Sequence, residues 1–255
     1  MSSPLKVWVE AEGRLLRLRL SRPKANLIDA AMIGALDQAL TSHLPNPALS
    51  GVLVDAEGPS FSYGASVEEH LPRQCERMLR GIHGVILRMV ESPVTILVAV
   101  RGQCLGGGLE VALAGHLRFA AADAVLGQPE MRLGVFAPAA SCLLPELIGP
   151  ARALDLLVSG RTISGAEAAA IGLVHAAATE PERAALAYFD EHLKPKSASS
   201  LRHALKAARF DYIARVKAKI TAVERLYLDE LMRTHDATEG LQAFVEKRAV
   251  QWQHR

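Results

Sequence analysis

The sequence predicts an α/β fold, and two kinds of segment carry that prediction. GVLVDA (51–56) and TILVAV (95–100) are short runs of consecutive apolar residues, as is typical of strands covered on both faces. Segments with helical periodicity lie between and after these runs, so strands and helices alternate through most of the chain. The chain has 255 residues, half of them hydrophobic, which is enough for a large buried core.

The first elements are a hairpin and a helix. The chain opens with VWVEAEGRLLRLRL, where three leucines alternate with two arginines over residues 16–20 and Glu12-Gly13 supplies a turn. This alternation predicts a β-hairpin. Residues 29–42 then show the spacing of a helix, with apolar side chains at Ala31, Ile33, Leu36 and Leu40.

The middle of the chain alternates loops and helices. The loop EGPSFSYGAS follows the first apolar run, and we expect a long helix from about Val67 to Val90 after it. The second apolar run leads through RGQ into three glycines and a helix that reaches about Leu113. SGAE (164–167) is a capping box for a short helix that Gly172 can close.

The composition changes at KPKSASS (194–200), a linker-like stretch with one proline and three serines. Nearly everything from Leu201 onward has helical periodicity. We therefore expect a core with the active site over residues 1–195 and a helical region over residues 196–255. Such a tail has too little core of its own, so it should pack on the body or on a neighbouring subunit.

The totals exclude several classes of protein. A formal net charge of +2 and few aromatic residues give no reason to expect binding to nucleic acid or to a membrane. The cysteines, Cys75, Cys104 and Cys142, form no CxxC pair, and the nine histidines form no HExxH motif, so neither a disulfide framework nor a metal site is expected. A reduced, cytoplasmic compartment fits this composition best.

The stretch CLGGGLEVALAGH (104–116) places three glycines between a strand and a helix. The N–H groups at a helix N-terminus are unpaired, and glycine lets another molecule approach them closely. As a carbonyl oxygen held there becomes negative, each well-placed N–H donor stabilises it by about 3 kcal/mol. The alternative interpretation is a tight packing turn in which Glu110 only complements the helix dipole.

Two further pieces add to the glycine turn. VLGQPEMRLG (125–134) places Glu130 twenty residues after Glu110. Taken alone, Glu130 would be a solvated charge on a loop. Two carboxyl groups in one cavity, however, can be in different protonation states, so that one accepts a proton and the other donates one. FSYGAS (61–66) is a glycine turn after a buried strand. It either exposes backbone N–H groups or is simply the turn that joins the strand to the next helix.

FSYGAS, LGGGLE and GQPE together resemble the enoyl-CoA hydratase (crotonase) superfamily, in its order and near its spacing. The resemblance extends to RPKAN (22–26), SGRTISGAEAAAIGLV (159–174) and EGLQAFVEKR (239–248). It implies a spiral of ββα repeats with a C-terminal helical region for trimerisation, and a homo-oligomer that is a trimer or a dimer of trimers. It also implies an acyl-CoA thioester as substrate and no cofactor, because the CoA is part of the substrate.

The resemblance also implies roles for single residues. The backbone N–H groups of Ala65 and Gly107 would form an oxyanion hole, and Glu110 and Glu130 would be the two catalytic acids. Positions that contact CoA in the family are matched by Lys24, Phe244 and Lys247. Tyr63 and Phe136 are candidates for the acyl pocket, or for core. Ser66 replaces a frequent aspartate, and residues 138–144 (PAASCLL) replace a glycine-rich polar stretch, so a more apolar pocket is expected.

That variant stretch, with FSYGASVEEH and QCLGGGLE, resembles one branch of the family, the cyclohexa-1,5-diene-1-carbonyl-CoA hydratases. The branch hydrates the ring product of benzoyl-CoA reduction in anaerobic aromatic degradation, giving 6-hydroxycyclohex-1-ene-1-carbonyl-CoA. A general straight-chain enoyl-CoA hydratase, an isomerase and a ring-opening hydrolase stay open as alternatives. A further alternative is RNA binding by the basic segment RHALKAARFDYIARVKAK (202–219), whose simpler interpretation is a solvated helix face.

Overall fold

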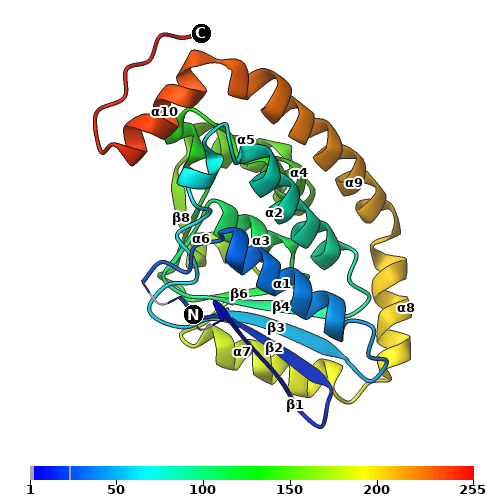
Figure 1. Cartoon of the computed structure of the whole chain (residues 1–255). Helices are drawn as coiled ribbons and strands as arrows, with labels where there is room; N and C mark the ends of the chain where they lie inside the picture. Colours follow the sequence, from blue (N-terminus) through cyan, green and yellow to red (C-terminus); the bar gives the residue numbers. More distant parts are fainter. Residues whose placement is uncertain (1–2, 23) are drawn as a thin grey trace.

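Two β-sheets organise the computed structural model, which describes residues 3–22 and 24–255 (Figure 1). In this part of the chain the larger sheet has the strand order β1-β2-β3-β4-β6-β9. Its strands are β1 (Leu5–Glu10), β2 (Leu15–Leu20), β3 (Gly51–Ala56), β4 (Thr95–Val100), β6 (Leu117–Ala120) and β9 (Ala176–Ala177). The smaller sheet has the order β5-β7-β8, from β5 (Gln103–Leu105), β7 (Val125–Gly127) and β8 (Thr162–Ser164).

The predicted hairpin is confirmed. β1 and β2 pair antiparallel from Leu5 opposite Leu20 to Glu10 opposite Leu15. The other neighbouring pairs in the larger sheet are parallel. The strands β3 and β4 are the two apolar runs of the sequence, and both are almost wholly buried because helices cover both faces of the sheet.

One face of the larger sheet carries α1 (Ala30–His43) and α2 (Cys75–Val90), and α7 (Pro181–Tyr188) covers the other, as Figure 1 shows. Asp29 caps α1 by accepting a hydrogen bond from Met32 N–H. On the α7 face, Phe119 packs with Phe189, which lies in the π-helical turn η3 (Phe189–Leu193). The helices thus bury an apolar face on either side of the sheet.

The helix expected from about Val67 is wrong over its first turns. Glu68–His70 form a short 3₁₀ turn, η1, and α2 begins only at Cys75. Pro72 explains the difference, because a proline disfavours helical backbone at the residue before it. Leu71 accordingly has extended dihedrals (φ −62°, ψ 150°).

Short helices follow the strands of the smaller sheet. α3 (Gly107–Ala114) follows β5, and the 3₁₀ turn η2 (Pro129–Leu133) follows β7. The predicted capping box is confirmed, since Ser164 accepts a hydrogen bond from Glu167 N–H and begins α6 (Gly165–Ala170). Two further helices, α4 (Pro138–Ile148) and α5 (Pro150–Ser159), lie between η2 and β8.

The C-terminal helices pack back on the body. Ser197 caps α8 (Ala198–Ala208), which leads into α9 (Phe210–Arg225). α9 runs beside α2 and α4, and its inward side chains Val216 and Ile220 are buried (Figure 1). After the π-helical turn η4 (Leu226–Glu230) and the 3₁₀ turn η5 (Leu231–Arg233) comes α10 (His235–Val245), whose side chains hold the last residues of the chain.

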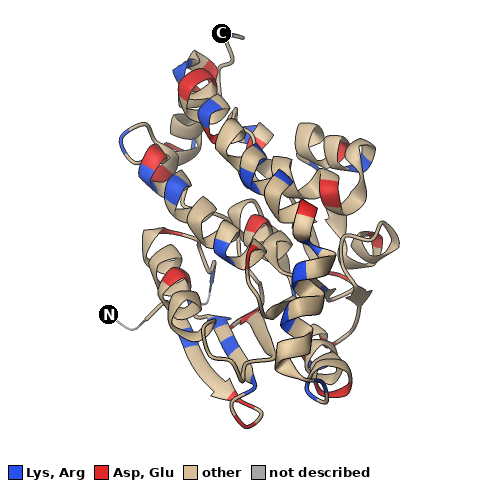
Figure 2. Cartoon of the chain, turned by 90° about the vertical axis from the view of Figure 1, so that its right-hand side faces the viewer, with Lys and Arg blue, Asp and Glu red and all other residues tan. Residues whose placement is uncertain are grey.

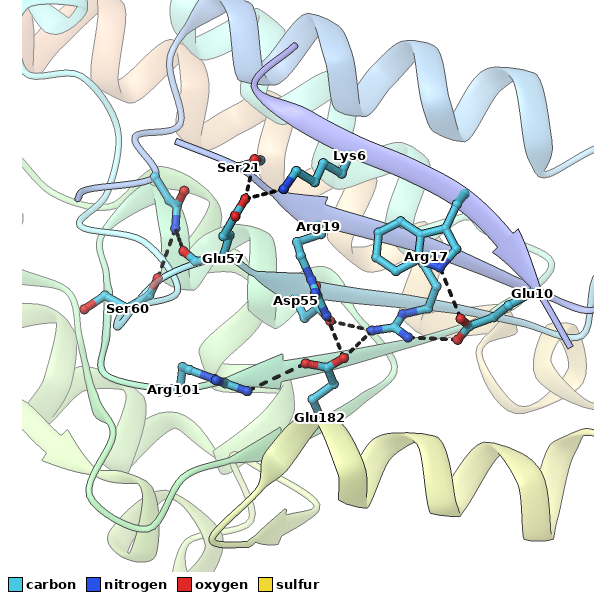
Figure 3. A network of polar contacts seen from close by, with 12 residues as sticks. Lys6, Glu10, Arg17, Arg19, Ser21, Asp55, Glu57, Ser60, Arg101 and Glu182 are labelled. Atoms are coloured by element: carbon cyan, nitrogen blue, oxygen red, sulfur yellow. Dashed lines mark hydrogen bonds and ion pairs between the residues drawn. The ribbon is translucent and has the colours of Figure 1, made fainter. Parts of the chain in front are cut away.

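A network of charged side chains ties the hairpin to β3 and α7 (Figure 3). Arg17 Nη2 lies 2.6 Å from both Asp55 Oδ2 and Glu182 Oε1, and Arg19 Nε lies 2.7 Å from Asp55 Oδ1. The Arg17 guanidinium also stacks over the Trp8 ring at 4.9 Å. Since Arg17 and Asp55 are both buried, each charge depends on its partners.

Charges of both signs are interspersed over the helices that face the viewer in Figure 2. No helix among the described residues is both long enough and apolar enough to cross a bilayer.

Candidate active site

The two glutamates converge because their strands are neighbours. β5 and β7 pair in parallel, with Leu105 opposite Gly127, so both strands end at the same edge of the smaller sheet. Gly106 N–H donates to Gly127 O at 3.0 Å and fixes the glycine turn to the turn after β7. Glu110 stands in the first turn of α3 and Glu130 in η2, and each directly follows one of these strand ends. A spacing of twenty residues in sequence thus becomes proximity in space.

Each glycine of the triplet leaves room for a different neighbour. A Cβ on Gly106 would lie 2.7 Å from Glu130 Oε1, and Gly106 also has a positive φ of 50°. A Cβ on Gly107 would lie 3.1 Å from Ala65 N, and one on Gly108 would lie 2.5 Å from Ser62 Cβ. Gly108 therefore serves packing, whereas Gly106 and Gly107 lie against Glu130 and Ala65.

Ala65 and Gly107 lie side by side with their N–H groups free. The loop before Ala65 is held against β5, since Ser62 N–H donates to Gln103 O at 2.9 Å and Leu105 N–H donates to Ser62 O at 3.0 Å. Among the hydrogen bonds of residues 3–22 and 24–255, neither Ala65 N–H nor Gly107 N–H is a donor. Two adjacent unpaired N–H groups, one of them at the N-terminus of α3, can bind an oxygen that gains negative charge.

Glu110 is buried but held by the start of another helix. Its Oε1 accepts a hydrogen bond from Ala140 N–H at 2.9 Å, in the first turn of α4. Burial raises the pKa of the Glu110 carboxyl above its ordinary value, and the N–H groups of Ala140 and Ala139 and the charge of His83 offset part of this rise. The small residues 138–140 let the helix end reach the carboxylate, which explains one effect of the variant stretch PAASCLL.

Glu130 has a different environment. Burial, and then the negative charge of Glu110, raise the pKa of the Glu130 carboxyl to about 8. The buried Gln128 amide faces this carboxyl, and with its nitrogen turned inward it donates to Oε1 and Oε2 at 3.0 and 3.1 Å. With its oxygen turned inward, the same amide accepts the proton of the neutral acid. Gln128 can therefore hold Glu130 in either protonation state.

A histidine–glutamate pair lies behind the site. His83 on α2 is buried, and its Nδ1 lies 2.7 Å from Glu224 Oε2 on α9. Glu224 also lines a cavity of about 610 Å³ between α2 and the α9–η5 segment, together with Cys75 and Leu228. The pair thus lies beside this cavity, and the charge of His83 lowers the pKa of the Glu110 carboxyl.

Comparison with known proteins places the chain. The model of the enoyl-CoA hydratase/isomerase family matches residues 10–255. A cyclohexa-1,5-dienecarbonyl-CoA hydratase of Thauera aromatica is 64% identical over 254 residues, covering 100% of this chain and 98% of that protein.

The chain belongs to the enoyl-CoA hydratase/isomerase family.

More distant members of this family agree. A probable enoyl-CoA hydratase of Bacillus subtilis (strain 168) is 34% identical over 247 residues, covering 92% of this chain and 93% of that protein. The family predicted from the sequence and the enzyme class, an enoyl-CoA hydratase, are thus confirmed.

The expected fold class is also confirmed. The structure of an enoyl-CoA hydratase from Mycobacterium avium subsp. paratuberculosis K-10 superposes with a TM-score of 0.85 over 99% of both chains, at 20% identity. One from Bacillus halodurans gives 0.87 over 94% of this chain and 100% of that one, at 18% identity. At these identities the likeness concerns the fold alone.

The residues expected to bind the rest of an acyl-CoA lie at the surface. Phe244 is 56% exposed near the end of α10, and Lys247 follows it at the surface. Lys24 is exposed in the loop before α1. Tyr63 is 49% exposed, whereas Phe136 packs edge-on against Tyr227 with ring centroids 5.2 Å apart. Of the two acyl-pocket candidates, Tyr63 is exposed and Phe136 is partly buried; the roles of all five stay predictions.

Sequence reasoning missed four polar residues around the acids: Gln128, His83, Glu224 and Tyr227. A signal existed for His83, which interrupts the apolar side of α2 between Leu79 and Ile86. Gln128 stands in the GQPE motif, but nothing in its spacing distinguishes a turn residue from a partner of Glu130. Across the described residues, no three His, Cys, Asp or Glu side chains are arranged to hold a metal ion.

Proposed function

We propose that this enoyl-CoA hydratase adds water to cyclohexa-1,5-diene-1-carbonyl-CoA and forms 6-hydroxycyclohex-1-ene-1-carbonyl-CoA. The main support for this substrate is the 64% identity, over the whole chain, to a cyclohexa-1,5-dienecarbonyl-CoA hydratase. The geometry supports the chemistry, since two carboxyl groups and two free N–H groups meet at the ends of β5 and β7. A general enoyl-CoA hydratase is not favoured, because the relatives with that broader name are far less similar.

The thioester carbonyl is proposed to sit against Ala65 and Gly107. Their N–H groups donate to its oxygen and stabilise the negative charge that develops there during addition. No cofactor is required for this step, because the thioester itself is the electron sink and the protein supplies donors and acids.

The two glutamates are proposed to act from opposite protonation states. The start of α4 favours the ionised form of Glu110, which makes it the base. Burial beside that negative charge keeps the proton on Glu130, which makes it the acid. Sequence alone left this assignment open, and it depends on the Ala140 hydrogen bond.

The proton transfers balance. Glu110 takes a proton from water as the water oxygen bonds to the ring carbon β to the carbonyl. Electrons of the double bond move to the thioester oxygen as an extended enolate. They return when Glu130 protonates the ring carbon at the far end of the conjugated system, the γ position. One water molecule is gained, one double bond of the diene is lost, and a proton must pass from Glu110 back to Glu130 before the next cycle.

RNA binding by residues 202–219 is not supported by the contacts. Arg202 donates to main-chain oxygens at the end of α1, and Arg209 stacks over Tyr212 at 4.5 Å. Arg215 pairs with Glu146 at 2.8 Å, and Lys217 pairs with Glu91. These side chains fasten the C-terminal helices to the body.

Subunit assembly is proposed for residues 196–255, beyond the core of residues 1–195. Phe210 is 70% exposed at the start of α9, and Leu226 is 44% exposed directly after its end. Apolar side chains of this kind fit a trimer or a dimer of trimers. Cys75, Cys104 and Cys142 are free thiols, which supports a reducing, cytoplasmic compartment.

Product analysis tests the function. Purified protein is incubated with the cyclic dienoyl-CoA, with crotonyl-CoA and with a saturated ring acyl-CoA as blank. The proposal predicts a product heavier by one water, with kcat/KM for the cyclic diene at least about 100-fold above that for crotonyl-CoA. An unchanged mass would indicate isomerisation. A preference for crotonyl-CoA would instead indicate a general enoyl-CoA hydratase.

A further inference from the structure

The side chain of Tyr227 is wholly enclosed, yet its hydroxyl has no protein partner. Its exposed fraction is 0%, and no described protein atom forms a hydrogen bond with its Oη. A buried hydroxyl without a partner costs stability, so the hydroxyl of Tyr227 needs an explanation.

Two features define the position of Tyr227: the contact of its ring with Phe136 and its place in the turn η4. Its ring packs edge-to-face on Phe136, with centroids 5.2 Å apart and planes inclined by 72°. Phe136 lies between Glu130 and Ala140 in the chain, and so belongs to the segment that connects the acid to the residue holding Glu110. Tyr227 itself stands in the π-helical turn η4, a distortion that is frequent at functional sites.

The hydroxyl lies in the field of both acids. After burial, the neighbouring charges that raise the pKa of the Tyr227 phenol are those of Cys75, Glu130 and Glu110. The phenol therefore keeps its proton over the working range of pH. It is an unpaired donor whose ring packs on Phe136, in the segment between Glu130 and Ala140, and a reacting water there needs several polar partners.

We infer that Tyr227 is a third catalytic group of the site, whose O–H donates a hydrogen bond to the oxygen of the water that is added and then to the hydroxyl of the product. This inference rests on the proposed function. Tyr227 gives up no proton in this role, since Glu110 takes the proton of the water and Glu130 supplies the one that goes to carbon. Its hydroxyl orients the water toward the ring.

Tyr227→Phe tests the inference, because it removes one oxygen and keeps the ring on Phe136. We expect kcat to fall about tenfold or more with KM nearly unchanged, and the melting temperature to stay the same or rise. Tyr188→Phe is the matched control, since Tyr188 packs with Phe119 and His175 on the opposite face of the larger sheet. It should keep full activity.

A binding measurement separates catalysis from packing. The affinities of the 6-hydroxy product and of its analogue without the hydroxyl, cyclohex-1-ene-1-carbonyl-CoA, are compared in both proteins. Wild type should prefer the hydroxy compound, and Tyr227→Phe should lose about tenfold of that preference. Equal preference and an unchanged kcat in the variant would overturn the inference while leaving the hydratase intact; a wild type that hydrates neither diene nor enoyl-CoA would overturn the proposed function instead.

Discussion

The carboxylate of Glu110 accepts a hydrogen bond from Ala140 N–H at 2.9 Å, although the two residues are thirty positions apart on different helices. This contact brings the positive end of α4 to a carboxylate that is otherwise buried. It makes the two acids unlike each other, because Glu130 lies beside the negative charge of Glu110, which raises the pKa of the Glu130 carboxyl.

Removing that donor should impair the base. Ala140→Pro deletes the N–H at the third position of α4, where a proline is tolerated because the residue lies in the first turn. We expect kcat to fall about 10- to 100-fold, and the pH below which activity is lost to rise. Arg152→Pro, at the third position of α5, is the control. A full rate in Ala140→Pro would show that the helix end does not support Glu110.

The pH dependence follows from the two carboxyl groups. Activity requires Glu130 protonated, so kcat should fall as the pH rises through its pKa of about 8. Stability should also fall as the pH rises, because folded Glu130 keeps a proton that the unfolded chain loses near pH 4.5. The free energy of unfolding should decline between these pH values. Glu130→Gln should flatten that decline, and an unchanged slope would contradict the raised pKa.

The first glycine of the triplet gives a steric prediction. Gly106→Ala places a Cβ 2.7 Å from Glu130 Oε1 and strains a backbone with φ of 50°. We expect kcat to fall at least about 100-fold as the carboxyl is displaced, with a loss of stability of about 1 kcal/mol or more. Gly34→Ala, in the exposed part of α1 with open space around it, serves as control: it should leave kcat unchanged and raise the stability by about 0.5–1 kcal/mol.

The network around Arg17 should matter for stability and not for catalysis (Figure 3). Asp55→Ala leaves the buried Arg17 with one strong partner fewer, and should lower the free energy of unfolding by about 3 kcal/mol. Asp155→Ala breaks the exposed pair with Arg161 and should cost less than about 1 kcal/mol. Chemical denaturation measures both, and kcat of the folded Asp55→Ala protein should be near wild type.

The fold class and the main elements could be predicted because their signals are local. The apolar runs of β3 and β4, the Ser164 capping box and the hairpin turn each follow from a few adjacent residues. The predicted start of α2 near Val67 is wrong, because Pro72 disfavours helical backbone at Leu71 in spite of the helical periodicity around Val67. The site was predictable only in part. Glu110 and Glu130 follow from motifs, but the contacts of Tyr227 and of the His83–Glu224 pair join segments more than ninety residues apart.

Single and double substitutions of the two acids test most directly whether Glu110 and Glu130 act as one unit. Hydration of the cyclic dienoyl-CoA is measured for Glu110→Gln, Glu130→Gln and the protein with both changes, with the exposed Glu191→Gln as control. If the glutamates share one proton-transfer step, each single variant loses at least about 1000-fold in kcat and the double variant loses little more. Losses that multiply, or a near wild-type rate in either single variant, would contradict a two-acid site.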